Sequence, residues 1–364
     1  MVLLTGLFII YFILLIILLT GWKRAMRSEK PTAHGKEVLI SIVIPARNEE
    51  LTIGSLLADL AAQEYKRFEV IVVNDYSEDE TMWVVSRFEM KNLQIIHNRG
   101  SGKKAALTTG IRQAKGSIIV TTDADCSVSP GWLLEIHHQF RNPEMMFAFG
   151  PVRMGGTDSF FDSLQRLEFS SLIGSGAATA ALGLPTVCNG ANLAFRKKAF
   201  LEVKGYEGNL KIPSGDDEFL MRKVLKRYPA GVRFVNTEAM LVTTRPQPDP
   251  QAFVNQRIRW ASKWRYNPSY VTKGLAVFVL LIQITFVVNW FFVFTPLILQ
   301  SLFLLTIKVI LEAAFLLQVC RFLKMRWNWL AFFSLQVLYP FYVVGVGAAS
   351  FFVPFQWKNR IFKP

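Results

Sequence analysis

Residues 117–126 read SIIVTTDADC, a short apolar run that ends in two aspartates separated by one alanine. The run is rich in β-branched residues, as is typical of a buried strand. Carboxylates held near one another at the end of such a strand repel unless a cation or a proton offsets their charge. Three interpretations are open at this point: a metal site, an acidic turn and a helix N-terminus.

Strands and helices alternate on both sides of this stretch, between residues 38 and 245. The short connections predict parallel strands joined by right-handed crossovers. We therefore expect an α/β domain with a mixed, mainly parallel sheet and flanking helices. The predicted strands are VLISIVIP, FEVIVVN, LQIIH and GSIIVTT, and the predicted helices are LTIGSLLADLAAQ, SEDETMWVVSRFEM with Ser77 as its N-cap, and KKAALTTGIRQAK.

Polar side chains follow three of the predicted strands. The carboxyl ends of parallel strands meet at one edge of a sheet, where such folds bind ligands. Any single loop has a simpler explanation, because Asn and Asp suit turns and Ser suits a helix N-cap. Three polar loops at one edge nevertheless indicate a binding site. The residues are Arg47, Asn48 and Glu49 after the first strand, Asp75 and Ser77 after the second, and Asp123 and Asp125 after the fourth.

The kind of ligand follows from the motifs. The sequence has no GxGxxG loop after the first strand and no GxxxxGK[ST] loop, which argues against a dinucleotide dehydrogenase and a P-loop nucleotidase. Mg²⁺ and Mn²⁺ prefer oxygen ligands and bind through one or two carboxylates plus substrate phosphates. Asp123 and Asp125 are therefore candidate ligands of Mg²⁺ or Mn²⁺, through which the site would handle phosphate.

Both ends of the chain are apolar. Residues 2–22 carry no charge and are long enough to span a bilayer, and Lys23 and Arg24 follow them. This order predicts a retained anchor with its C-terminal side in the cytoplasm, since a signal peptide carries its charges first. Two further spans are expected within Gly274–Val319, hinged near Pro296. A last segment, from about Trp329 to Val353, is a span or a re-entrant or interfacial segment, because the tail after it is basic.

The net charge of +14 does not by itself indicate nucleic acid. Much of it lies beside the apolar segments, where anionic lipid headgroups attract it, and no basic recognition module is visible. We expect no nucleic-acid partner. The cysteines Cys126, Cys188 and Cys320 lack metal spacing or obvious pairing, which is typical of free thiols in a reducing cytosol.

Six stretches resemble, in order, landmarks of the inverting family 2 glycosyltransferases. The resemblance covers about Val38 to Trp264, and the apolar ends resemble the membrane-bound branch that contains QxxRW. It implies a GT-A fold and transfer of a hexosyl unit from a nucleotide sugar. The stretches are SIVIPARNEE, VIVVNDYSEDET, GKKAALTTGIRQAKGSIIVTTDAD with its DxD motif, CNGANLAFRKKAF, SGDDEFLMRKV and QRIRW.

The expected organisation has six parts. They are an N-terminal transmembrane anchor at 1–22, a basic juxtamembrane linker at 23–37, a cytoplasmic GT-A catalytic domain at 38–245, an interfacial helix region with QRIRW at 246–270, about three transmembrane segments at 271–354 and a basic tail at 355–364.

The resemblance assigns residues to the nucleotide side of the site. It implies that Asp75 contacts the uracil base and that Arg47 and Glu49 border the nucleotide. Asp123 and Asp125 correspond to the nucleotide-and-metal pair, with Asp125 as the direct metal ligand. The divalent metal would neutralise the diphosphate charge as UDP leaves.

Other residues correspond to the sugar side. Lys103 would reach a phosphate or a hydroxyl of the donor sugar, with a solvated lysine at a helix start as the alternative. Asn189 and Asn192 would bind sugar hydroxyls, and Gly190 would allow close backbone approach.

Inversion needs a base that takes the proton of the acceptor hydroxyl. By resemblance this base is Asp217, the second carboxylate of an acidic pair. Asp216 stands where the family commonly has glutamate, and Glu218 is expected to be a first-turn acid that favours the helix dipole. Adjacent carboxylates also raise one pKa, which suits a base near neutral pH. The alternative is an acidic helix N-terminus after Gly215.

QRIRW lies just before the first C-terminal apolar segment. The resemblance implies that Gln256, Arg259 and Trp260 close the nucleotide site and pack against the acceptor, with the arginine on the diphosphate. The alternative is an interfacial helix whose Trp and Arg mark the headgroup level, and we expect both to hold.

The expected function is hexosyl transfer, with a UDP-sugar as donor and a lipid as acceptor, at the cytoplasmic face of the inner (plasma) membrane. The main alternative is a processive polysaccharide synthase, which QRIRW favours, although about four membrane segments are few for a translocation channel. Transfer to a polyprenyl phosphate and a catalytically silent assembly subunit are further alternatives. Lys308 and Glu312 do not require a transporter, because at i,i+4 they can pair on one helix face.

Overall fold

The computed structural model describes residues 2–27, 36–210, 212, 214–266, 270–358 and 360–362. The chain forms two compact units. Unit 1 comprises Met1–Arg24, Gly156–Thr179 and Pro246–Pro364, and unit 2 comprises Ala25–Gly155 and Ala180–Arg245. Much of the linker expected at 23–37, residues 267–269 of the expected interfacial region and part of the basic tail lie outside the described residues.

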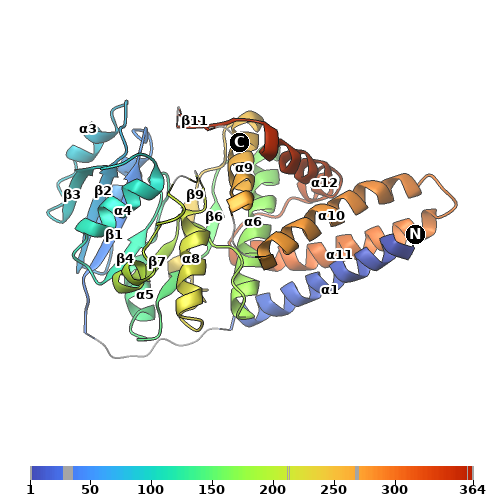
Figure 1. The fold of residues 1–364 in the computed structure, drawn as a ribbon, viewed down its shortest axis with the longest axis horizontal. Helices are drawn as coiled ribbons and strands as arrows, with labels where there is room; N and C mark the ends of the chain where they lie inside the picture. The colour runs from blue at the N-terminus through green and yellow to red at the C-terminus, as the bar shows by residue number, and fades with distance from the viewer. Residues whose placement is uncertain are drawn as a thin grey trace. The chain divides into compact units, whose positions relative to one another are not determined.

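Unit 2 is built on a seven-stranded sheet with the strand order β3-β2-β1-β4-β7-β5-β8 (Figure 1). The first four of these strands run parallel, while β7 is antiparallel to both of its neighbours. The expected mixed, mainly parallel sheet is confirmed. The strands are β1 Ile40–Ala46, β2 Phe68–Asn74, β3 Leu93–His97, β4 Ile118–Thr121, β5 Phe147–Phe149, β7 Leu193–Arg196 and β8 Val232–Phe234, and a separate parallel pair is formed by β6 Val152–Met154 and β9 Val242–Thr244.

The helices of unit 2 follow the strands in the expected alternation. One detail of the prediction is wrong: Ser77 is not an N-cap, because its N–H donates to Asn74 Oδ1 at 2.8 Å and the helix begins only at Thr81. Asparagine side chains offer the following backbone such bonds, in competition with a helix. The helices are α2 Ile53–Ala61, α3 Thr81–Ser86, α4 Lys103–Gln113, α5 Trp132–Gln139, α7 Lys197–Glu202, α8 Asp216–Arg227 and the short 3-10 helix η1 Glu238–Met240.

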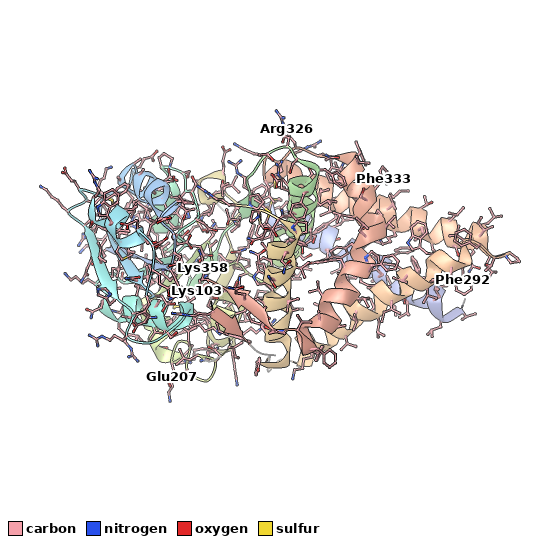
Figure 2. All side chains as sticks on the ribbon, turned by 90° about the horizontal axis from the view of Figure 1, so that it is seen from above. Lys103, Glu207, Phe292, Arg326, Phe333 and Lys358 are labelled. Carbon is pink, nitrogen blue, oxygen red and sulfur yellow. The ribbon has the colours of Figure 1, made fainter. Side chains whose placement is uncertain are left out.

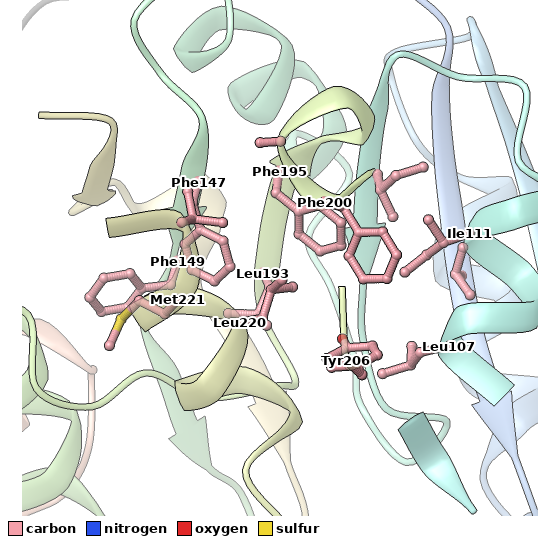
Figure 3. Packing of buried hydrophobic residues seen from close by; sticks show 14 of the residues in the cluster. Leu107, Ile111, Phe147, Phe149, Leu193, Phe195, Phe200, Tyr206, Leu220 and Met221 are labelled. Carbon is pink, nitrogen blue, oxygen red and sulfur yellow. The ribbon is translucent and has the colours of Figure 1, made fainter. Parts of the chain in front are cut away.

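One hydrophobic core joins the sheet to α4, α7 and α8. Figure 3 shows Ile111 of α4 on the side of Phe200 and Leu107 beside Tyr206, with Leu220 of α8 in the same cluster. Residues at alternate positions of a strand point to the same face of a sheet, so these helices cover one face. Helices α4 and α8, which begin with Lys103 and Asp216, are therefore packed on the same face of the sheet.

Unit 1 consists mainly of long helices. Within the part of the chain that the structure describes, four helical ranges are long and apolar enough to cross a membrane: Val2–Ala25, Lys273–Phe292, Ile298–Phe322 and Trp329–Phe352. Phe333 on the last of these is 51% exposed and lies on the outside of its helix (Figure 2). The elements are α1 Val2–Ala25, α6 Phe160–Ala181, α9 Pro250–Ser262, η2 Lys263–Tyr266, α10 Tyr270–Phe292, α11 Ile298–Phe322, α12 Trp329–Phe352, and the hairpin of β10 Phe355–Trp357 and β11 Arg360–Phe362.

The apolar segments predicted at both ends of the chain are thus helices. α1, α10 and α11 lie side by side and share a cluster of buried side chains that includes Phe8, Phe286 and Leu304 (Figure 1). Pro296 lies between α10 and α11, where the sequence predicts a hinge. The last segment is one continuous helix with Pro340 inside it.

Residues 156–179 differ from the expectation of one continuous domain at 38–245, because they group with unit 1. They form most of α6, which packs closely on α11. A Cβ at Gly174 would lie 2.6 Å from Val319 Cγ2 and 2.9 Å from Phe315 Cζ. The missing side chain lets the two helices approach, and this long-range contact is not visible in the local sequence.

We predict opposite effects for two helical glycines of unit 2. Gly110→Ala would put a Cβ 2.4 Å from Val43 Cγ1, so it should lower the free energy of unfolding by about 1–3 kcal/mol. Gly54→Ala is the matched control, since its nearest neighbour is at 3.6 Å. It should be neutral or stabilise by up to about 1 kcal/mol through helix propensity. Denaturant unfolding of the purified protein measures both, and equal effects would contradict the close packing of α4 on the sheet.

Candidate active site

The carboxyl ends of β1, β2 and β4 lie at one edge of the sheet, because these strands are parallel and adjacent. The polar loops predicted to share an edge therefore do so. The loop before α4, the loop after β4 and the start of α8 meet there around Lys103, Asp123 and Asp216. This meeting point defines the candidate site in unit 2.

Lys103 holds the site together. Its Nζ lies 2.6 Å from Asp123 Oδ1 and 3.2 Å from Asp216 Oδ2, and all three side chains are at least partly buried. A Cβ at Gly190 would come within 3.0 Å of Asp216 Oδ2 and 3.2 Å of Lys103 Nζ, so a larger residue there would crowd the ion pair. Of the two interpretations of Lys103, the solvated lysine at a helix start is wrong, since its ammonium pairs with two carboxylates.

The three consecutive acids at the start of α8 have different partners. Asp216 pairs with Lys103, and Glu218 pairs with Arg222 at 2.8 Å. Asp217 is only partly buried, and its Oδ2 accepts the N–H of Gly190 at 3.1 Å. Glu218 was expected mainly as a first-turn acid; the structure adds a buried i,i+4 ion pair, which gives it a structural role.

The charges of Lys103 and Asp216 support one another. Burial opposes ionisation of the lysine, but its attraction to Asp123 and Asp216 prevails and raises the pKa of Lys103. Burial likewise opposes ionisation of Asp216, but Lys103 and then Lys104 prevail and lower the pKa of that carboxyl. A carboxylate with a lowered pKa is a weak base at neutral pH. Asp217 is therefore the better candidate for proton transfer.

Arg47 organises the loops expected to border the nucleotide. Its guanidinium donates to the carbonyl oxygens of Asp75 at 2.9 Å and Tyr76 at 2.7 Å, and pairs with Glu78 at 3.0 Å. Glu49 joins the same loops, since its N–H donates to Thr81 Oγ1 at 2.7 Å. The structure thus places Arg47 and Glu49 at the expected edge, and their contact with a nucleotide stays a prediction.

Asp75 is almost fully buried. Its Oδ1 accepts from Asn98 Nδ2 at 2.7 Å, and its two oxygens accept from the N–H of Gly102 at 3.0 and 3.1 Å. The carboxylate therefore ties the end of β2 to the loop that begins α4. A contact with a uracil base would have to share these oxygens, and it too stays a prediction.

Asp123 and Asp125 are the candidate metal ligands. Among the described residues, no group of three or more His, Cys, Asp or Glu side chains is arranged to hold a metal. Cys126 beside them stays a thiol, because burial and then Asp125 and Asp123 raise its pKa. The donor set is thus two carboxylates without a thiolate, which fits Mg²⁺ or Mn²⁺ completed by substrate phosphates rather than a site made by the protein alone.

The two asparagines predicted on the sugar side differ. Asn192 is fully buried, and its amide bonds to Pro151 O, Met240 O and Trp132 Nε1. Its predicted contact with sugar hydroxyls is therefore wrong, because the amide is buried and makes its hydrogen bonds inside the fold. Asn189 Oδ1 accepts the N–H of Ala191 at 2.9 Å, which shapes the turn that presents Gly190. The sugar contact of Asn189 stays a prediction.

QRIRW lies on α9 of unit 1, and the structure adds a residue that the sequence analysis passed over. Arg257 binds Glu168 of α6 through two bonds of 3.0 and 2.5 Å. Its guanidinium lies 4.2 Å from the centre of the Trp260 ring and also donates to Gln256 Oε1. Gln256 and Trp260 are thus held by the buried Arg257, whereas the roles of Gln256, Arg259 and Trp260 towards donor and acceptor stay predictions. The signal available in the sequence was Glu168, the acid that precedes the uncharged second half of α6.

We predict that Lys103→Met destabilises the protein in a pH-dependent way. The lowered pKa of Asp216 means that its contribution is present above about pH 4 and is lost as pH falls through the folded value. The raised pKa of Lys103 means that its contribution is present below about pH 10 and is lost above the folded value. Between these limits the variant should lose about 3 kcal/mol, the cost of an unpaired buried charge.

Denaturant unfolding at about pH 7 and at about pH 2, below the ordinary pKa of an aspartate, measures the loss, which should be smaller at the lower pH. Adding Asp216→Asn to Lys103→Met should recover part of it, since the isolated charge is then removed. A loss that is the same at all pH values would contradict the ion pair as its cause.

Known proteins resemble this chain in sequence and fold. The sequence profile described as Glycosyl transferase family 2 matches residues 41–204. A poly-beta-1,6-N-acetyl-D-glucosamine synthase from Staphylococcus epidermidis is 24% identical over 282 residues, which cover 74% of this chain and 65% of that protein. One of the same name from Staphylococcus aureus is 29% identical over 189 residues, 49% of this chain and 44% of that protein. The chain thus spans less than two thirds of these relatives' length.

Among solved structures, a mannosyltransferase from Pyrobaculum calidifontis, in complex with GDP-Man and Mn²⁺, aligns over 95% of both chains. The TM-score is 0.60 at 16% sequence identity, which shows a shared fold. The sheet order, the acidic strand ends and the matched profile agree with one another. The chain therefore carries a glycosyl transferase family 2 domain with the GT-A fold.

Proposed function

We propose that this protein is a membrane-bound glycosyltransferase that moves a hexosyl unit, with inversion, from a UDP-linked sugar to the end of a glycan chain. The observation that carries the proposal is the convergence of Asp123, Lys103 and Asp216 at the sheet edge, with Asp217 beside Gly190. This arrangement offers a site for a diphosphate and a separate carboxylate for a proton.

The side chains suggest how one displacement would proceed. The acceptor hydroxyl attacks the anomeric carbon, its proton passes to Asp217, and the bond from that carbon to the diphosphate oxygen breaks, with the electron pair leaving on the nucleotide. Asp216, kept ionised by Lys103, holds the start of α8 in place. Asp123 and Asp125 would hold a divalent metal, which supplies charge neutralisation for the leaving group.

The proposed acceptor differs from the one expected from the sequence. The expected acceptor is a lipid, with a polysaccharide as the alternative. The similarity to poly-beta-1,6-N-acetyl-D-glucosamine synthases supports the alternative, a growing glycan and an N-acetylhexosaminyl donor. The lipid acceptor remains the second candidate, because the described residues offer only four helices long enough to cross a membrane.

The same four helices support a multi-pass protein of the inner (plasma) membrane. The last turn of α1 carries Lys23 and Arg24, which supports a cytoplasmic side for that end by the positive-inside rule. We propose that the family 2 domain lies on this side, where nucleotide sugars are made. QRIRW on α9 would then act at the membrane surface, with Gln256, Arg259 and Trp260 towards donor and acceptor.

The product distinguishes the two acceptors. Membranes that contain the protein should transfer label from UDP-N-acetylhexosamine, with Mn²⁺ or Mg²⁺ present, into water-soluble material of high mass. Label that partitions into organic solvent would make the acceptor a lipid and would contradict the glycan proposal. No transfer from any UDP- or GDP-sugar by folded protein would favour the silent assembly subunit.

Two substitutions separate the proton acceptor from the metal site. Asp217→Asn should abolish transfer while nucleotide-sugar binding persists, because only the proton acceptor is lost. Asp125→Ala should remove metal dependence together with donor binding. Asp158→Asn, at an exposed carboxylate of unit 1, is the control and should transfer like the unchanged protein. Calorimetry for donor binding and radiolabel transfer measure these effects. Weaker donor binding by Asp217→Asn, with part of the transfer retained, would contradict the assignment.

A further inference from the structure

We propose that Lys104 is a positioning residue, which aligns Asp216 and Asp217 for transfer by anchoring the backbone segment that precedes them. The inference rests on the proposed function and deepens it, because it concerns how the candidate base is held. Lys104 is the second lysine of the sequence GKKAAL, next to Lys103 at the start of α4.

The ammonium of Lys104 is enclosed by backbone oxygens. The residue is 4% exposed, and its Nζ donates to Asn209 O at 2.9 Å, Ile212 O at 2.9 Å and Ser214 O at 2.8 Å. An ammonium group has three N–H donors, so these bonds use its full capacity. The ring of Phe219, on the first turn of α8, lies 5.1 Å from the same nitrogen.

The burial of the Lys104 ammonium is costly, so its contacts with the carbonyl oxygens indicate a specific role. Taking an ammonium out of water costs several kcal/mol, and an apolar side chain of similar volume is often tolerated as well or better. The three carbonyl groups belong to residues that lie outside regular helices and strands, and such carbonyls need donors when they are buried. One lysine therefore supplies donors to all three carbonyls from a rigid helix, although Asn209 O also accepts the N–H of Ile212 at 3.1 Å.

The anchored segment leads directly into the acidic pair. Ser214 is followed by Gly215, whose φ of +78° turns the chain into α8, and then by Asp216 and Asp217. Fixing the carbonyl of Ser214 thus fixes the point from which both carboxylates project. Lys103, one residue earlier on α4, binds the Asp216 side chain at 3.2 Å. Two adjacent lysines hold the pair, one through the backbone and one through a carboxylate.

The charge of Lys104 acts in the same direction. Against the effect of burial, Lys103 and then Lys104 lower the pKa of Asp216. Removing the Lys104 charge should therefore raise the pKa of Asp216. If transfer needs Asp216 ionised, the acid limb of the pH profile, where activity falls as pH is lowered, should move to higher pH. A residue that only stabilised the fold would not move this limb of the pH profile.

The test compares three variants of the full-length protein in membranes. Lys104→Met removes both donors and charge, and Lys104→Gln keeps N–H donors without the charge. Lys115→Ala is the matched control, an exposed lysine just beyond α4. We measure kcat against pH, the dissociation constant of the UDP-sugar, and hydrogen exchange of the peptide 206–219.

Lys104→Met should lower kcat by about 10- to 100-fold, as expected when a catalytic group is misplaced, while donor affinity changes by less than about threefold. Its acid limb should move to higher pH, and the peptide should exchange faster. Lys104→Gln should share the pH shift but retain more of kcat and of the protection. Lys115→Ala should match the unchanged protein.

Unchanged kcat, pH profile and exchange in folded Lys104→Met would overturn the proposal. If Lys104→Met does not fold, wild-type kcat and pH profile in Lys104→Gln would overturn it equally. Failure of the proposed function is distinct, because it would show as no transfer by the unchanged protein. The exchange of peptide 206–219 would still report whether Lys104 anchors the segment.

Discussion

The ammonium of Lys103 between Asp123 and Asp216 is the contact on which the candidate site depends. It lies 2.6 and 3.2 Å from the two carboxylates, which belong to the loop after β4 and to the start of α8. Carboxylates at the edge of a buried sheet repel, and a cation from the chain offsets that repulsion. Gly190 leaves room for the group, and α4, which carries the lysine, is packed on the hydrophobic core that also seats α8.

This ion pair also separates the tasks of neighbouring acids. Asp216 is ionised and pairs with Lys103, and Glu218 pairs with Arg222. Asp217, between them in the sequence, accepts the N–H of Gly190. Adjacent carboxyl groups acquire different chemistry when their surroundings favour different protonation states. The division requires the backbone before α8 to be held firmly. The three carbonyl oxygens around Lys104 provide that hold.

Unit 1 follows the same rule in apolar surroundings. Lys308 and Glu312 form the expected i,i+4 pair at 3.1 Å, and the structure adds Tyr11 and Gln336, both of which bond to Glu312. Arg257 and Glu168 form a second buried pair, between α9 and α6. An unpaired charge among apolar helices costs several kcal/mol, so each ion here has its counter-ion. The Arg257–Glu168 pair and the bonds of Tyr11 and Gln336 to Glu312 join helices to one another, and these contacts explain polar residues that would otherwise suggest transport.

The sequence by itself determined strands β1 to β4, the helices between them, the apolar helices at both ends of the chain and the sheet edge that carries the site. β2 and β3 have the predicted bounds, and Asp123 follows β4 as the pattern indicates, because apolar periodicity and turn residues act over a few neighbours in the chain. Only the tertiary structure decided which polar side chains have hydrogen-bond or ion-pair partners inside the fold. It buried Asn192, moved residues 156–179 to unit 1 and revealed Arg257 and Lys104. Arg257 meets a residue 89 positions away and Lys104 one 110 positions away. Partners so distant are chosen by the packing of whole elements, which no local pattern of residues encodes.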